Sequence, residues 1–160
     1  MRTKIFMLVI STILLAWTTT ASAASYANGI SRNQMSAYLK SKGFPAEDAF
    51  EKGNGHRILK TTIDGVHYDI YFLDCATDDA GICGSVQFAQ SWTMNSPDIQ
   101  LINKWNRERR FMRAYLTESK TVMWAEYDFF MGPGGSTALL NRNLDMLRAL
   151  TKSLKTHFSF

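Results

Sequence analysis

A tight hairpin in the first half of the chain constrains the fold more than any other feature of the sequence. Two segments of alternating apolar and polar residues, 57–63 and 66–74, are separated by Asp64 and Gly65. Asp-Gly is a preferred sequence for the two-residue turn that joins neighbouring antiparallel strands. A turn centred on this dipeptide opposes apolar residues on one face and opposite charges on the other. The predicted pairs are Leu59 with Ile70 and Lys60 with Asp69.

Three further segments show strand-like alternation and extend the predicted antiparallel sheet to five strands. They are residues 83–93, 110–117 and 121–130. A turn at Ser119 and Lys120 would pair the last two strands and bring their apolar residues together on one face. The opposite face of this pair is then aromatic and charged. Its predicted pairs are Tyr115 with Trp124 and Arg113 with Glu126.

Helix-start signals occur at three places between and around the strands. Ser31 and Gln34 have the spacing of a capping box. Residues 96–98 are Ser-Pro-Asp, which is typical of a helix start. Ser136 follows a glycine-rich break and precedes leucines at helical spacing up to Phe158. The order α-β-β-β-α-β-β-α therefore predicts an α+β fold, in which helices cover the apolar face of an antiparallel sheet.

The first 23 residues are expected to be a signal peptide that is removed on export. A basic start at residues 1–4 precedes the apolar run 5–17 and the small residues Ala21, Ser22 and Ala23. This run is shorter than the ~20 residues that span a bilayer, although an uncleaved membrane anchor is the alternative. Cleavage after Ala23 leaves residues 24–160 as one domain without a transmembrane segment. The sequence thus predicts a periplasmic or secreted protein.

Cys75 and Cys83 are the only two cysteines, and in an oxidising compartment we expect them to form a disulfide. They flank a polar, glycine-containing stretch between two predicted strands, and the alternation puts both thiols on the same face of the sheet. Closing so short a loop stabilises a fold by about 2.5 kcal/mol. A redox-active or metal-binding pair is the alternative.

The charge pattern does not favour a nucleic-acid partner. Loss of residues 1–23 removes Arg2 and Lys4, which lowers the net charge from +4 to +2. A basic run between residues 104 and 113 is interrupted by Glu108. We expect this run to be a solvated or protein-contacting face, with binding to anionic lipid or polysaccharide as the alternative.

The sequence contains none of the common zinc, nucleophile or calcium motifs. The three histidines lack the spacing of a zinc site, and no Gly-x-Ser-x-Gly motif surrounds Ser136. Asp74, Asp78 and Asp79 do not have the spacing of a calcium loop. We therefore expect no enzyme activity, no cofactor and no metal site.

The middle of the chain resembles the YbjN family. The resemblance is carried by Leu101-Ile102-Asn103-Lys104-Trp105-Asn106, followed by Arg110-Phe111-Met112-Arg113-Ala114-Tyr115-Leu116, and extends over about residues 31–158. It implies a fold like that of type III secretion chaperones, which act as dimers that hold unfolded segments of a client. Members of the family are described as sensory transduction regulators. This sequence differs from the cytoplasmic members of the family in its predicted signal peptide and its cysteine pair.

These observations favour a non-catalytic, exported, chaperone-like regulatory module that binds a protein or peptide. The resemblance to the chaperones implies a homodimer, which nothing else in the sequence indicates. Aromatic residues and arginine contribute most of the binding energy at protein interfaces. On this ground the candidate contact residues are Trp105, Asn106, Arg110, Arg113, Tyr115 and Trp124. Trp105 fits the core equally well, and Asn106 also fits a turn. One alternative is a small-ligand or envelope-lipid binder with a pocket between helix and sheet. Another is an unrecognised hydrolase.

Overall fold

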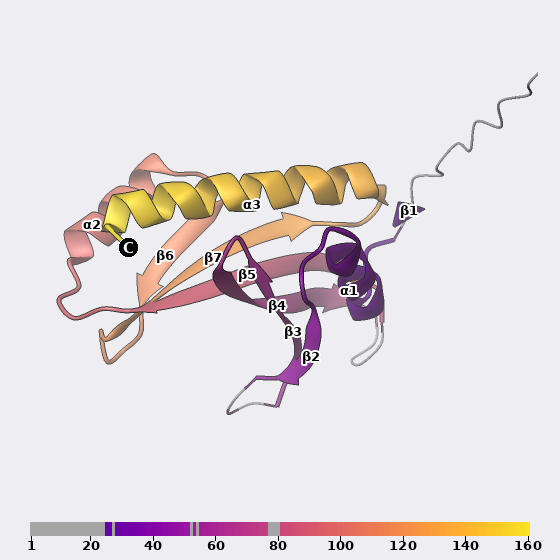
Figure 1. Ribbon diagram of the computed structural model, residues 1–160, viewed down its shortest axis with the longest axis horizontal. Coiled ribbons are helices and arrows are strands. Elements are labelled where there is room, and N and C mark those ends of the chain that lie inside the picture. The colour runs from indigo at the N-terminus through magenta and orange to yellow at the C-terminus, as the bar shows by residue number, and fades with distance from the viewer. Residues whose placement is uncertain (1–24, 27, 52, 54, 77–80) are drawn as a thin grey trace, which may run out of the picture.

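The computed structural model describes residues 25, 26, 28–51, 53, 55–76 and 81–160 (Figure 1). The predicted signal peptide, residues 1–23, lies outside the described residues. Part of the predicted turn between the cysteines, residues 77–80, does so as well.

The main sheet has six antiparallel strands in the order β2-β3-β4-β5-β7-β6. Its strands are β2 (Glu47–Phe50), β3 (Arg57–Ile63), β4 (Val66–Cys75), β5 (Cys83–Thr93), β6 (Met112–Leu116) and β7 (Val122–Phe130). The five predicted strands are all present, and the antiparallel α+β class is confirmed. The sixth strand, β2, lies between the first predicted helix and the first predicted strand and is not among the predicted elements. It is an edge strand with mostly exposed side chains, so it lacks the apolar alternation that marks a buried strand.

Both predicted hairpin registers are confirmed. In the first hairpin Leu59 lies opposite Ile70, and Lys60 lies opposite Asp69. In the second hairpin all of the predicted cross-strand pairs occur, including Arg113 with Glu126 and Tyr115 with Trp124. The Asp-Gly turn is tight because Asp64 has φ 50° and Gly65 has φ 78°, which is the left-handed geometry that these residue types tolerate.

Within the described residues, three helices pack on one face of this sheet: α1 (Arg32–Ser41), α2 (Ile99–Glu108) and α3 (Thr137–Phe158). Ser31 and Gln34 form the predicted capping box of α1, and Ser136 caps α3. The predicted start of α2 was two residues early. Asp98 rather than Ser96 is its cap, because the Asp98 carboxylate accepts a hydrogen bond from the Gln100 backbone N–H at 2.8 Å.

A two-stranded sheet joins the start of the described chain to the start of α3. It consists of β1 (Ser25–Tyr26) and β8 (Gly135–Ser136). Tyr26 is buried in this position. A side chain at Gly135 would collide with the backbone oxygen of Met131, so only glycine fits where β1, β8 and the preceding turn come together.

The core fills the space between the helices and the inward face of the sheet. Its largest fully buried side chains include Met35 and Leu39 of α1, Trp105 of α2 and Leu140 of α3. In Figure 1, α3 lies along the sheet, and its side chains form hydrogen bonds with residues of β4, β5 and β7, while α1 contacts β3. No helix in the described part of the chain is both long and apolar enough to cross a membrane.

The predicted disulfide between Cys75 and Cys83 is present, and the two cysteines are direct cross-strand partners at the ends of β4 and β5. Cys83 is also paired on its backbone with Ile30, through two hydrogen bonds of 3.0 Å. The disulfide therefore lies where β4, β5 and the segment before α1 meet.

Candidate binding surface on the open face of the sheet

The three helices share one face of the main sheet, and the described residues place no helix on the other face. Buried side chains of α1, α2 and α3 belong to the same apolar cluster as the inward-facing strand residues. We call the opposite side the open face. Its side chains on β3, β4, β5, β7 and β6 include Lys60, Thr62, His67, Asp69, Tyr71, Gln87, Ala89, Ser91, Trp124, Glu126, Asp128, Arg113 and Tyr115, together with the apolar Ile58, Leu73 and Phe130.

The common register of the strands aligns charged residues in a row across the open face. Lys60 is opposite Asp69, and its ammonium group donates to the Asp69 carboxylate at 2.8 Å. Asp69 is opposite Ala89 on β5. Ala89 is in turn opposite Glu126, which pairs with Arg113 on the edge strand. The small side chain of Ala89 leaves room in the centre of the row for larger neighbours.

Glu126 is a buried acid on the open face, with only 7% of its surface exposed. Arg113 donates to Glu126 Oε2 from Nε at 2.7 Å and from Nη2 at 2.6 Å. The Tyr115 hydroxyl donates to Oε1 at 2.6 Å, and the Gln87 amide donates to Oε2 at 3.4 Å. A buried carboxylate is tolerated when its charge is paired and its oxygens are hydrogen-bonded, and both conditions hold here. The contacts fix Arg113 and Tyr115 in place.

Two further contacts extend this polar network across the sheet. The Gln87 amide also donates to Asp128 Oδ1 at 2.8 Å. The Tyr71 hydroxyl donates to Glu51 Oε1 at 2.9 Å, which ties β4 to the segment after β2. The open face thus presents side chains that are held by one another before any partner arrives.

Burial changes the acid–base behaviour of the tyrosines on both faces. It raises the pKa of Tyr115 to about 12, and the hydrogen bond to Glu126 acts in the same direction. Burial is also the main cause that raises the pKa of Tyr71 above its ordinary value, and the hydrogen bond to Glu51 is the second cause. Burial is likewise the main cause of pKa values of about 12 for Tyr38, Tyr68 and Tyr127.

We expect the free energy of unfolding to fall as the pH rises from about 10 to about 12. Unfolded tyrosines lose their protons near pH 10, whereas the folded chain retains them up to about pH 12. The folded state therefore binds more protons in this window, and rising pH favours unfolding. For Tyr68, which is 2% exposed, the effect is on the order of 2 kcal/mol. Urea denaturation across this range measures it.

A Tyr68→Phe variant is the control for this prediction. It keeps the buried ring but has no hydroxyl proton to lose. Its free energy of unfolding should therefore decline less steeply between pH 10 and pH 12 than that of the unaltered protein. Equal slopes for the two proteins would contradict the prediction.

The structure brings three of the six candidate contact residues together on the open face. Tyr115 and Trp124 are direct cross-strand partners, and Arg113 is two residues from Tyr115 on the same side of β6. Tyr115 is 41% exposed and Trp124 is partly exposed. Whether these three residues contact a partner stays a prediction.

Trp105 lies in the core rather than on a surface. Its exposed fraction is 0%, and the indole N–H donates to the backbone oxygen of Met112 at 3.0 Å. The ring also packs against His157 and Phe158 at the end of α3. Of the two interpretations of the sequence, the core position is the one that the structure shows.

Asn106 connects α2 to the edge strand β6. Its amide nitrogen donates to the backbone oxygen of Ala114 at 2.8 Å, and its Oδ1 accepts from the Ala114 N–H at 2.9 Å. Ala114 pairs with Ala125 of β7 on its other side. One side chain thus satisfies two backbone groups at the outer edge of the sheet.

Arg110 lies apart from the open-face residues, in the segment between α2 and β6. Its guanidinium group lies over the ring of Phe111 at 4.9 Å. Phe111 is 59% exposed and has φ 71°, a left-handed conformation that bulky residues rarely adopt. In the sequence, Phe111 stands out only as part of the family motif, and no pattern predicts this exposed aromatic side chain.

The central role of Glu126 was not predicted from the sequence either. Its pairing with Arg113 was predicted, but a glutamate on the polar side of a strand is usually solvated. Its burial results from Arg113 and Tyr115 on β6 and from Gln87 on β5, the two strands that flank β7. No sequence signal indicated that Glu51 would accept a hydrogen bond from Tyr71.

Among the residues that the structure describes, no group of three or more His, Cys, Asp or Glu side chains could hold a metal ion. The open face offers hydrogen-bond donors, acceptors and aromatic surface, with its central carboxylate already engaged by Arg113 and Tyr115. This arrangement is suited to recognition through polar and aromatic contacts.

Comparison with known families gives a match that covers most of the chain. The family model YbjN, described as "Putative bacterial sensory transduction regulator", matches residues 31–160. This range includes every helix and every strand of the main sheet. No curated protein matches the chain.

Proposed function

The chain belongs to the YbjN family of bacterial regulators, and we propose that it is an exported, non-catalytic module that binds a protein or peptide on its open face. Such a module would exert its regulatory effect through the binding and release of its partner on the open face. A chaperone-like hold on an extended segment of the partner is the form of binding that the family resemblance favours.

The composition of the open face carries this proposal. Tyr115, Trp124 and Arg113 lie together on it, and tyrosine, tryptophan and arginine contribute most to binding energy at protein interfaces. The Arg113 side chain is 64% exposed although it is held by Glu126. Side chains that are fixed before binding lose less conformational entropy when a partner arrives, which supports affinity.

Export is supported by the leader and by the cysteine pair. Residues 1–23 have the three regions of a signal peptide, and the Cys75–Cys83 disulfide is typical of an oxidising compartment. Cleavage after Ala23 would leave β1 intact, so that Tyr26 could still occupy its buried position.

A non-catalytic role is supported by the contacts of Glu126. A general base needs a carboxylate oxygen directed at the substrate proton, but the two oxygens of Glu126 accept hydrogen bonds from Arg113 and Tyr115. An unrecognised hydrolase is the alternative, and it predicts turnover of a substrate that a binding module would leave intact.

Site-specific photo-crosslinking in intact cells tests the proposal. A photoreactive amino acid replaces Ser91, a small exposed residue of the open face that is opposite Trp124. The matched control replaces Ala138, which is small and exposed on α3. We expect a discrete adduct from position 91 and none from position 138, and mass spectrometry of the adduct identifies the partner.

The same sample distinguishes the parts of the proposal. An adduct of twice the chain mass would identify a second copy of the chain as the partner. Intact-mass measurement shows whether the protein begins at Ala24, as export with cleavage requires. No adduct at position 91, or equal adducts at both positions, would contradict binding on the open face.

A further inference from the structure

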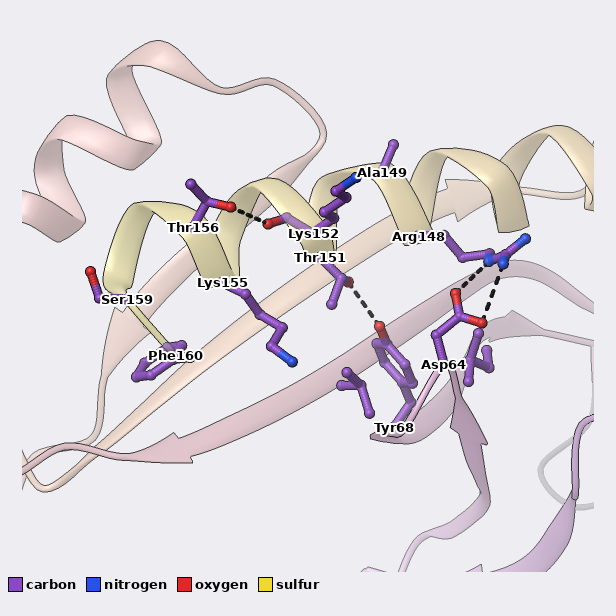
Figure 2. A pocket seen from close by; sticks show the side chains of 12 residues that line it. Asp64, Tyr68, Arg148, Ala149, Thr151, Lys152, Lys155, Thr156, Ser159 and Phe160 are labelled. Carbon is purple, nitrogen blue, oxygen red and sulfur yellow. Dashed lines mark hydrogen bonds and ion pairs between the residues drawn. The ribbon is translucent and has the colours of Figure 1, made fainter.

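A groove lies on the opposite side of the molecule from the open face, between α3 and the β3–β4 hairpin. It has a volume of about 740 Å³, within the range of about 300–1,000 Å³ that small-molecule sites occupy. The lining comes from the end of β3, the start of β4 and the second half of α3. Figure 2 shows the side chains that line it. None of the six candidate contact residues lines this groove.

The two ends of the groove are marked by different contacts. At one end Arg148 of α3 donates to both oxygens of Asp64 in the hairpin turn, at 2.6 and 3.2 Å. At the other end Phe160 stacks on Trp92 with ring centroids 5.0 Å apart. Figure 2 shows the groove running along α3 between these ends. A space bounded in this way suits a ligand of limited length better than a polypeptide that passes through.

The walls of the groove are mostly apolar, with one polar pair at their centre. Ile63, Val66 and the rings of Tyr68 and Phe160 supply the apolar surface. The Tyr68 hydroxyl lies 2.8 Å from Thr151 Oγ1, in the interface between the sheet and α3. Apolar walls with a few fixed polar groups are the usual composition of a small-molecule site.

This hydroxyl pair has one hydrogen-bond donor to spare. Tyr68 and Thr151 carry one hydroxyl proton each, and a single proton forms the bond between them. The amide group of Gln90 donates a hydrogen bond to Thr151 Oγ1 at 3.2 Å. This bond occupies one of the acceptor lone pairs of the threonine oxygen and leaves the hydroxyl protons unchanged. The second hydroxyl proton is not used in this bond. It can be donated to an acceptor atom in the groove or, when the Gln90 amide turns over, to the buried Gln90 Oε1, which has no hydrogen-bond partner among the described groups.

The charge of the lining favours an anion. Arg148 is paired with Asp64, whereas Lys155 has no ion pair within the described chain. Figure 2 shows Lys155 extending from α3 toward the sheet, on the side of Tyr68, while Lys152, which also borders the groove, directs its side chain away from it. A lysine ammonium beside a hydroxyl donor can hold a carboxylate. Arg148, whose guanidinium fork would better suit a phosphate, is already occupied.

We propose that this groove binds a single-chain amphiphile with a carboxylate head, such as a long-chain fatty acid. The carboxylate contacts Lys155 and the Tyr68–Thr151 hydroxyl pair, and the hydrocarbon chain lies against Ile63, Val66 and Phe160. This site is separate from the open face and does not depend on the proposed protein partner.

Fluorescence titration with dansyl-labelled undecanoic acid tests the proposal on the mature chain, residues 24–160. Binding should raise the dansyl emission, and myristate should displace the probe. Myristyl alcohol of equal chain length should displace it at least about tenfold less well, because a charge-assisted hydrogen bond is lost. A dodecyl phosphate that displaces the probe better than myristate would overturn the assignment of a carboxylate head.

Two lysine variants separate the groove from general attraction to a basic surface. Lys155→Met should weaken probe binding about tenfold, because it removes the ammonium group that extends toward the groove. Lys152→Met removes the same charge from a neighbouring position that points away, and it should change the affinity less than about twofold. Equal losses in the two variants, or no binding by the unaltered chain, would overturn the proposal.

A third variant tests the hydroxyl pair. Tyr68→Phe keeps the apolar wall but removes one hydroxyl, and we expect several-fold weaker binding of the carboxylate probe. Displacement by myristyl alcohol should change less than displacement by myristate. Thermal unfolding of each variant, recorded alongside, confirms that the chains compared are folded. Unchanged binding of the carboxylate by Tyr68→Phe would exclude the hydroxyl pair from the site.

Discussion

Replacing Trp105 with alanine is expected to lower the free energy of unfolding by about 3–5 kcal/mol. The indole ring is fully buried and packs against Phe158 of α3. Its N–H donates to the backbone oxygen of Met112, so the change leaves both a cavity and an unpaired buried carbonyl. Trp105 of α2 contacts both α3 and β6. Its replacement should therefore destabilise the whole domain rather than one element. Urea denaturation monitored by circular dichroism measures the effect.

Trp124→Ala is the matched control, because it makes the same chemical change on the open face. Trp124 is only partly buried, so we expect a loss well below that of Trp105→Ala. The slope of the unfolding free energy against urea concentration should be similar for the two variants, because they expose a similar surface area on unfolding. If the two variants lost equal stability, the assignment of Trp105 to the core would be wrong.

Removal of the disulfide is expected to cost about 2.5 kcal/mol of unfolding free energy. The bond closes a short loop between β4 and β5, and Cys83 also pairs with Ile30 ahead of α1. Without the bond, the unfolded chain gains conformational freedom that it otherwise lacks. Denaturation with and without a thiol reductant, after labelling has shown that two thiols are free, measures the effect.

A Cys75→Ala/Cys83→Ala double variant provides the control for this experiment. It should resemble the reduced protein in stability and should not respond to the reductant. A response of the double variant would show that the reductant acts elsewhere. A reduced protein as stable as the oxidised one would contradict a structural role for the bond.

The registers of the two hairpins could be predicted from sequence because local chemistry and cross-strand pairing agreed. The Asp64–Gly65 turn fixed one register, and the pairing of Arg113 with Glu126 supported the other. Strand β2 could not be predicted in the same way. It is an edge strand with exposed side chains, and its position depends on pairing with β3 rather than on its own pattern.

The candidate site could be predicted only in part. Alternation placed Tyr115 and Trp124 on the same face, but helical spacing alone could not decide whether Trp105 faced the core. Ile99, Ile102 and Trp105 follow one stripe in sequence, yet Ile99 is exposed while the other two are buried. The packing of α2 against α3 and β6 makes that distinction. Burial of Glu126 likewise depends on neighbours from separate strands, which no local pattern encodes.

The hydrogen bonds of Asn106 have a consequence for assembly. A sheet can grow when another chain pairs with the free backbone of its outermost strand. At Ala114 the N–H and C=O that such a chain would need are already taken by one amide side chain. The last helical turn of α2 therefore terminates the sheet as an additional strand would, and a second molecule cannot be added at this point of β6 without first displacing Asn106.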